Sequence, residues 1–207
     1  MSDTCCGAPL EAGRLERRQR RVLVAVLAIN AVTFVMMAAA AAWSGSSALL
    51  SGALDNFGDA LTYGLSLAVV GAGRTAKARV AMFKGLLIGA AALGVAGQIA
   101  WRLFHPATPL FETMGAAALL NFGANLACLA MLTPHRRDDV NMASVWECSR
   151  NDVGEGVAVI AAAAAVWAFG SGWPDLVVAA GLLLLFLRSS ARVLGGAWRE
   201  LRPRTAT

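Results

Sequence analysis

The sequence predicts an all-α integral membrane protein with six transmembrane helices. Of its 207 residues, 57% are hydrophobic and only 15% are charged, and the mean hydropathy is +0.60. These values are more apolar than a soluble domain requires. The apolar residues form runs long enough to cross a bilayer, and most basic residues lie in short clusters between the runs. Composition and spacing together indicate a chain that crosses the membrane repeatedly.

Charge and cysteine content exclude two other classes. The net charge is +5 and the pI is near 9.6, yet no basic face is interleaved with aromatic residues, so nucleic acid is not an expected partner. Cys5 and Cys6 are adjacent, and Cys128 and Cys148 fall inside apolar segments. They cannot form the disulfide framework of a small secreted protein, and we expect free thiols.

The first helix is predicted over Val22–Trp43, after a polar tail at residues 1–21. A run of this length is too long for the apolar region of a signal peptide and long enough to span the membrane. Cys5 and Cys6 in the tail could pass a soft metal inward, although two idle thiols in a disordered tail are the commoner case.

Loops rich in Ser, Gly, Pro or basic residues separate the remaining apolar runs. We expect five further helices, from after Ser46 to before Arg74, from Val80 to Phe104, from Pro109 to Leu132, from Val140 to Trp167, and from Pro174 to beyond Arg188.

Small and polar residues within these helices have two interpretations each. Gly85 and Gly89 form a small-residue face that permits close helix packing, but a chance match is as good an explanation in a chain with 21 glycines. Asn121 and Asn125 share one helix face, where they either line a polar pathway or form interhelical hydrogen bonds. His135 lies at a loop end, where we expect a solvated side chain.

The basic clusters predict the orientation. They all fall on one side of a six-helix topology, which places both termini in the cytoplasm of a multi-pass cell-membrane protein. Trp43, Trp101, Trp167 and Trp173 then lie at the outer interface, as an aromatic belt would. The predicted domains are a cytoplasmic tail at 1–21, a transmembrane transport domain at 22–196, and a short cytoplasmic tail at 197–207 with no soluble C-terminal domain.

Asp55 and Asp59 are the most unusual residues of the second helix. They lie one turn apart, near the middle of a hydrocarbon layer about 30 Å thick. An aspartate at this depth costs about 2.5 to 3.5 kcal/mol. Two of them on one helix face need a cation, a proton or a partner, so this segment is interpreted as half of an ion site.

The fifth helix supplies the other half. It runs opposite to the second, and counting from its start places Asp152 level with Asp55, and Cys148 level with Asp59. Carboxylates and a thiolate at tetrahedral reach suit Zn²⁺ or the softer Cd²⁺ better than Mg²⁺ or Ca²⁺. Glu155 or a water could complete the site in place of Cys148. The charged residues of this helix could alternatively pair among themselves, namely Glu147, Arg150 and Glu155.

Three segments resemble the cation diffusion facilitator family. They are SSALLSGALDNFGD at 46–59, Asn-Asp-Val at 151–153, and Trp-Pro-Asp at 173–175. The resemblance implies proton-coupled efflux of divalent transition metals from the cytoplasm, usually by a homodimer, with Asp55, Asp59 and Asp152 at metal-site positions. Many zinc-transporting members have His where this chain has Cys148, which shifts the expected preference towards soft metals.

The expected function is therefore secondary transport rather than catalysis. The chain is predicted to export Zn²⁺ or Cd²⁺ by proton antiport, without a prosthetic group, as a dimer joined through its membrane helices. One alternative is a membrane-embedded metal sensor or partner protein without transport activity. Another is a membrane phosphotransferase, but the Asp-Gly and Ala-Arg pairs that precede the paired aspartates of the CDP-alcohol phosphotransferases do not precede Asp55.

Overall fold

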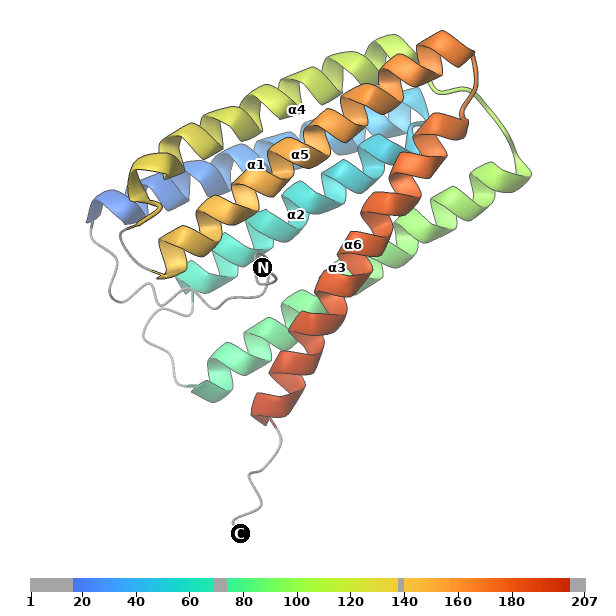
Figure 1. Cartoon of the computed structure of the whole chain (residues 1–207). Helices are drawn as coiled ribbons and strands as arrows, with labels where there is room; N and C mark the ends of the chain where they lie inside the picture. Colours follow the sequence, from blue (N-terminus) through green and yellow to red (C-terminus); the bar gives the residue numbers. More distant parts are fainter. Residues whose placement is uncertain (1–16, 69–73, 138–139, 202–207) are drawn as a thin grey trace.

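The structure, a computed structural model, describes residues 17–68, 74–137 and 140–201 (Figure 1). This part of the chain is helical and contains no strand, so the predicted all-α fold is confirmed. The elements in chain order are α1 (Arg17–Ser44), α2 (Ser47–Ala68), α3 (Arg74–Phe104), α4 (Phe111–Leu132), the 3-10 turn η3 (Thr133–His135), α5 (Val140–Phe169) and α6 (Trp173–Leu201).

Several helices extend beyond the apolar runs that predicted them. α1 begins at Arg17 rather than Val22, α3 begins at Arg74 rather than Val80, and α6 continues to Leu201. Hydrophobicity marks where a helix leaves the membrane, but Arg, Lys, Gln and Ala are good helix formers, so the helix continues into the polar segment. The helix boundaries therefore differ from the membrane boundaries at these ends.

α2 occupies the centre of the fold. It packs against each of the other five helices, and nearly every described side chain from Ser47 to Tyr63 is buried or half-buried. The other five helices are long and apolar enough to cross a membrane, whereas α2, with 22 residues, does not meet the same measure. A helix enclosed by other helices does not face lipid, so it can carry polar residues that a lipid-facing helix cannot.

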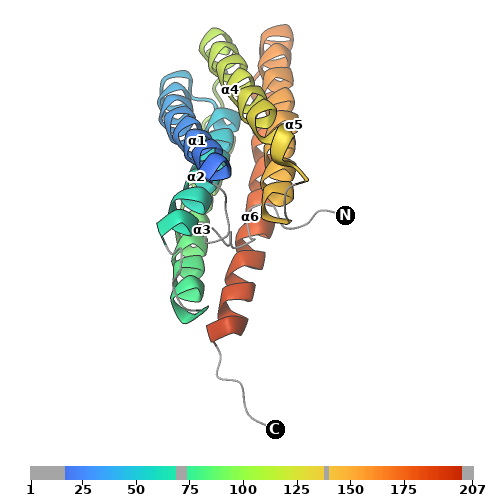
Figure 2. The ribbon, with the colours of Figure 1, turned by 90° about the vertical axis from the view of Figure 1, so that its left-hand side faces the viewer.

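In Figure 1 the helices lie closer together at one end of the bundle than at the other, and Figure 2 shows α3 and α6 extending beyond the other helices at the opposite end. α1, α2, α4 and α5 pack together, while α3 and α6 pair with each other and extend away towards the C-terminal end of α6. The connections at 45–46, 105–110 and 170–172 meet at the end where the helices lie closer together, which we call the short-loop end. There the Leu110 amide donates to the Ser44 carbonyl at 3.1 Å.

A carboxylate from α6 caps the first turn of α2 at the short-loop end. Asp175 is fully buried and accepts hydrogen bonds from Ser46 Oγ at 2.5 Å, from the Ser47 amide at 2.8 Å and from the Ala48 amide at 3.0 Å. Ser46 Oγ also accepts from the Leu49 amide at 3.0 Å, as an N-cap serine does. The N-terminus of the central helix is therefore fastened to α6.

The small-residue face of α3 packs against α6. Ser190 Oγ donates to the Gly85 carbonyl at 3.1 Å, and a Cβ placed at Gly89 would lie 3.4 Å from Ser190 Oγ. Both glycines thus lie where two helices approach closely, as small residues allow in membrane proteins. Of the two interpretations of this pair, the packing interpretation is confirmed.

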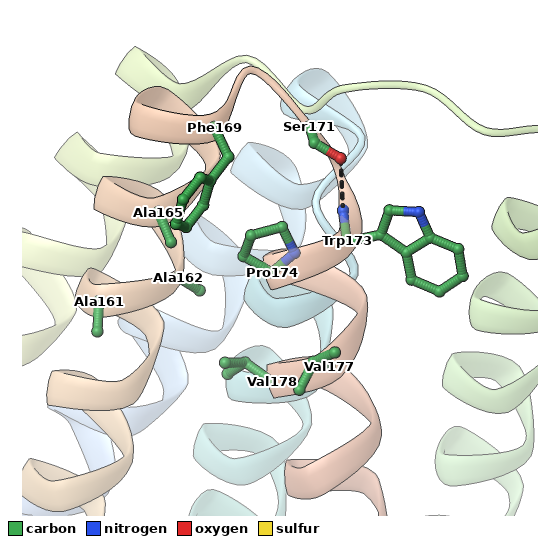
Figure 3. A pocket seen from close by; sticks show the side chains of 9 residues that line it. All are labelled: Ala161, Ala162, Ala165, Phe169, Ser171, Trp173, Pro174, Val177 and Val178. Carbon is green, nitrogen blue, oxygen red and sulfur yellow. Dashed lines mark hydrogen bonds between the residues drawn. The ribbon is translucent and has the colours of Figure 1, made fainter.

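An apolar groove of about 560 Å³ lies between α5 and α6 at the short-loop end (Figure 3). Its walls are alanine and valine side chains together with Phe169, Trp173 and Pro174. Ser171 Oγ accepts a hydrogen bond from the Trp173 amide at 3.5 Å within the same turn. None of the described residues that line this groove is ionisable, so they cannot hold a cation by charge.

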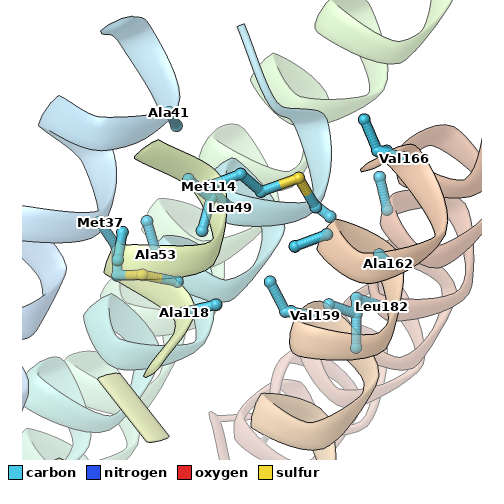
Figure 4. Close-up of a cluster of buried hydrophobic side chains, with 14 residues drawn as sticks. Met37, Ala41, Leu49, Ala53, Met114, Ala118, Val159, Ala162, Val166 and Leu182 are labelled. Atoms are coloured by element: carbon cyan, nitrogen blue, oxygen red, sulfur yellow. The ribbon is translucent and has the colours of Figure 1, made fainter. Parts of the chain in front are cut away.

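The largest buried cluster joins five helices, α1, α2, α4, α5 and α6 (Figure 4). It contains Met37 and Ala41 of α1, Ala53 of α2, and Val159 and further residues of α4, α5 and α6. Many of its members are alanines, whose small side chains let helices approach closely. A second cluster surrounds Tyr63 on the part of α2 that lies further from the short-loop end.

The four predicted interface tryptophans are exposed, from 60% for Trp101 to 78% for Trp43. This exposure is compatible with lipid contact. The prediction for His135 is wrong, because this side chain is only 8% exposed. η3 packs against α4 and α5, which removes the histidine from solvent. Within the described residues, Cys128 and Cys148 form no disulfide, as expected.

Candidate metal centre

The two aspartates of α2 lie in the protein interior. Asp55 is 7% exposed and Asp59 is 2% exposed, and they are one turn apart on the helix that all the others surround. Taking a carboxylate out of water carries a large desolvation cost unless a charge or proton compensates it. Burial therefore confirms the physical premise on which the sequence singled out this pair.

Cys148 and Asp152 of α5 are also buried, at 3% and 7% exposure. α5 packs directly against α2. One apolar cluster joins Ala53 to Val159 and the other joins Tyr63 to Val145, so the two clusters bracket the predicted site on both helices. The four predicted residues therefore occupy one stretch of the interior, between two apolar layers.

The side chains do not form a closed coordination shell in this conformation. Within residues 17–68, 74–137 and 140–201, no three His, Cys, Asp or Glu side chains form a group that could hold a metal ion. The structure thus places the predicted ligands in the same buried region without bringing three of them to coordination distance. A helix shift or a change of side-chain rotamer is needed to complete a site from them.

Asp59 has neighbours on three helices. Tyr63 on the same helix donates its hydroxyl proton to Asp59 Oδ2 at 3.5 Å. Asp59 also acts electrostatically on the Glu155 carboxyl of α5 and on the Cys128 thiol of α4. Glu155 Oε2 is buried without a hydrogen-bond partner. Glu155 therefore remains a candidate ligand alongside Cys148.

Arg150, the basic residue of this part of α5, points away from the interior. Its side chain is exposed, and its guanidinium lies 5.5 Å from the centre of the Trp146 ring. Arg136 approaches the same ring at 5.9 Å. Cation–π contacts of this kind are favourable at a polar boundary, and they account for Arg150 without involving the buried carboxylates.

Asparagines line the interface between α4 and the two site helices. Asn56 Nδ2 donates to Asn121 Oδ1 at 2.8 Å, which joins α2 to α4. Asn125 Nδ2 donates to the backbone carbonyl of Asp152 at 3.5 Å, which joins α4 to α5. The interhelical hydrogen bonds that the sequence left as one of two possibilities are present. The sequence analysis did not single out Asn56, although it stands between Asp55 and Asp59 in the chain.

Comparison with known proteins agrees with this architecture. The sequence model of a family described as the cation efflux transmembrane domain matches residues 23–201. No curated protein gives a significant match to the chain. The family match covers all six long helices, including the α2 and α5 segments that carry the candidate ligands. The chain therefore belongs to the cation efflux family, whose transmembrane domain carries cations across membranes, as its resemblance to the cation diffusion facilitators indicated.

Proposed function

We propose that this protein exports divalent transition-metal cations, with Zn²⁺ and Cd²⁺ as the preferred substrates. The observation that carries the proposal is the pair of buried aspartates, Asp55 and Asp59, on the helix at the centre of a cation efflux domain. A buried pair of acidic groups is held at a free-energy cost, and binding a divalent cation offsets that cost.

The proposed ligands are Asp55, Asp59 and Asp152, with Cys148 as the fourth. All four are buried in the same stretch of the α2–α5 interface. Zn²⁺ accepts a tetrahedral set of carboxylates and a thiolate, and Cd²⁺ favours the sulfur still more. Glu155 is the alternative fourth ligand, because its buried carboxyl interacts electrostatically with Asp59.

Transport would proceed by exchange of metal for protons. A metal ion that enters from the cytoplasm displaces protons from the carboxylates and from the thiol, since these groups ligate in their deprotonated forms. A rearrangement of the helices then opens the site to the outside. There protons compete for the same ligands, release the metal and return the protonated site to the inward state.

We further propose that both termini face the cytoplasm and that membrane helices hold a homodimer together. The basic clusters flank the end opposite the short-loop end, which supports this orientation. The reporter is Cys5, outside the described residues, after replacement of Cys6. An impermeant thiol reagent should label it only once cells are opened, and labelling of intact cells would contradict the topology.

Flux in sealed proteoliposomes tests the transport proposal. The wild-type protein should accumulate Zn²⁺ or Cd²⁺ when a pH gradient is imposed and lose this activity when the gradient is collapsed. Asp55→Ala and Asp59→Ala should each abolish flux while inserting normally, because each removes a ligand and a buried charge. Glu112→Ala is the matched control, since Glu112 is an exposed carboxylate in the first turn of α4.

Two outcomes would overturn the proposal. Wild-type flux in either aspartate variant would show that the metal site lies elsewhere than α2. Metal binding without flux in the wild-type protein would instead favour the alternative of a membrane-embedded sensor.

A further inference from the structure

Two buried amide oxygens beside the predicted ligands have no hydrogen-bond partner among the described residues. Asn56 is 1% exposed and Asn125 is 2% exposed. Each uses its amide nitrogen in an interhelical hydrogen bond, to Asn121 Oδ1 and to the Asp152 carbonyl. The oxygen of each amide, Oδ1, is buried, and nothing in the described part of the chain forms a hydrogen bond with it. Buried acceptors without partners are uncommon, and each one calls for an explanation.

The positions of the two asparagines relate them to the proposed site. Asn56 follows Asp55 directly on α2, and the nitrogen of Asn125 is bonded to the backbone of Asp152 on α5. Because the nitrogen of each side chain is held by another helix, its oxygen is kept in a definite direction rather than free to rotate. The two amides therefore present fixed neutral oxygens at the α2–α4–α5 interface.

We propose that Asn125 of α4, together with Asn56 of α2, supplies neutral oxygen ligands to the transported cation. The inference rests on the proposed function and adds a third helix to the site. An amide oxygen binds a divalent cation without adding negative charge, so it raises the number of ligands without raising the repulsion among the carboxylates. It is also a hard ligand, which favours Zn²⁺ over Cd²⁺ and opposes the preference of Cys148.

Titration of the purified full chain in detergent with Zn²⁺ alone and with Cd²⁺ alone tests the inference. Asn125→Leu, of similar size, should weaken Zn²⁺ binding about tenfold and Cd²⁺ binding less, so the Cd²⁺-to-Zn²⁺ affinity ratio rises. Asn30→Leu is the matched control. Asn30 is a buried membrane asparagine of α1, 3% exposed, and its nitrogen bonds to Val26 of its own helix.

Asn125→Asp separates the oxygen from the nitrogen of the amide. It keeps a side-chain oxygen but removes the donor to the Asp152 carbonyl. If the oxygen binds the cation, Asn125→Asp should bind Zn²⁺ more tightly than Asn125→Leu does. If the residue only positions Asp152, both variants should lose affinity equally and with no change in metal preference, which would overturn the inference.

Asp55→Ala in the same titration distinguishes this inference from the proposed function. Loss of binding in Asp55→Ala, with Asn125→Leu behaving like Asn30→Leu, would overturn the role of the asparagine alone. Full binding in Asp55→Ala would overturn the site itself. Elution of each variant as a single species on size exclusion shows that it is folded. If Asn125→Leu aggregates, the metal affinities of Asn125→Asp and of the wild type are compared instead.

Discussion

Buried aspartate occurs in two settings in this molecule, and the settings differ in what compensates the charge. Asp175 lies at the short-loop end and accepts three hydrogen bonds from Ser46, Ser47 and Ala48. The N-terminus of a helix has unused amide donors and the positive end of the helix dipole. Fixed groups of the protein therefore compensate the charge of Asp175 at all times.

Asp55 and Asp59 are also buried, at 7% and 2% exposure, but lie inside a helix. Backbone amides in a helix interior are already engaged within the helix, so they cannot stabilise these carboxylates. Compensation must come from side chains, from protons or from a bound cation, and the last two can leave. The difference between the two settings shows that burial alone does not identify a transport site. Under the proposed function, part of the compensation at Asp55 and Asp59 comes from a cation or from protons, which can leave.

The largest expected effect on stability is at Asp175. Asp175→Ala should lower the free energy of unfolding by about 3 kcal/mol, because it leaves two amides and a hydroxyl without their acceptor in a buried site. Thermal unfolding in detergent measures this. Ser46→Ala should lower the free energy of unfolding by only about 1 kcal/mol, because the Asp175 carboxylate still accepts hydrogen bonds from the Ser47 and Ala48 amides. Equal stability of Asp175→Ala and Glu112→Ala would show that the contact contributes nothing.

Asp55→Asn, unlike Asp175→Ala, should not destabilise the protein. Without metal its stability should equal or exceed that of the wild type, because the substitution removes a buried charge while keeping the shape of the side chain. With metal at a hundred times its dissociation constant, the wild type should gain about 2.7 kcal/mol and the variant should gain nothing. The same melting experiment with and without Zn²⁺ measures both. If Zn²⁺ still raises the stability of Asp55→Asn, the proposed difference between Asp55 and Asp175 is contradicted.

The smallest of these effects concerns the fourth ligand. Cys148→His should retain Zn²⁺ transport and lower the Cd²⁺-to-Zn²⁺ transport ratio about tenfold, because nitrogen and sulfur both suit zinc whereas cadmium prefers sulfur. Cys148→Ser should transport Zn²⁺ less well than Cys148→His. Flux measured for each metal separately tests this. If Cys148→Ser leaves the ratio unchanged and Glu155→Gln abolishes flux, then Glu155 is the fourth ligand.

Much of the candidate site could be predicted from the local sequence pattern. Two carboxylates one turn apart in an apolar, membrane-length segment predict burial, and Asp55 and Asp59 are buried. The set of residues that would coordinate the metal was harder to predict. Counting residues along straight helices placed Cys148 level with Asp59, but the structure relates Asp59 electrostatically to Glu155 as well. Helix tilt and axial offset change such pairings by a turn, and neither can be read from residue spacing.

Sequence patterns alone predict that this chain is an α-helical membrane protein, roughly where its long helices lie, and which residues would be costly to bury. These properties follow from local composition and periodicity, which act over a few turns. Three features emerge from the folded structure instead: α2 is the central helix, Asp175 caps it from 128 residues away in the chain, and Asn56 bonds to Asn121 across 65 residues. Such partners are chosen by the packing of whole helices, so no local pattern encodes them.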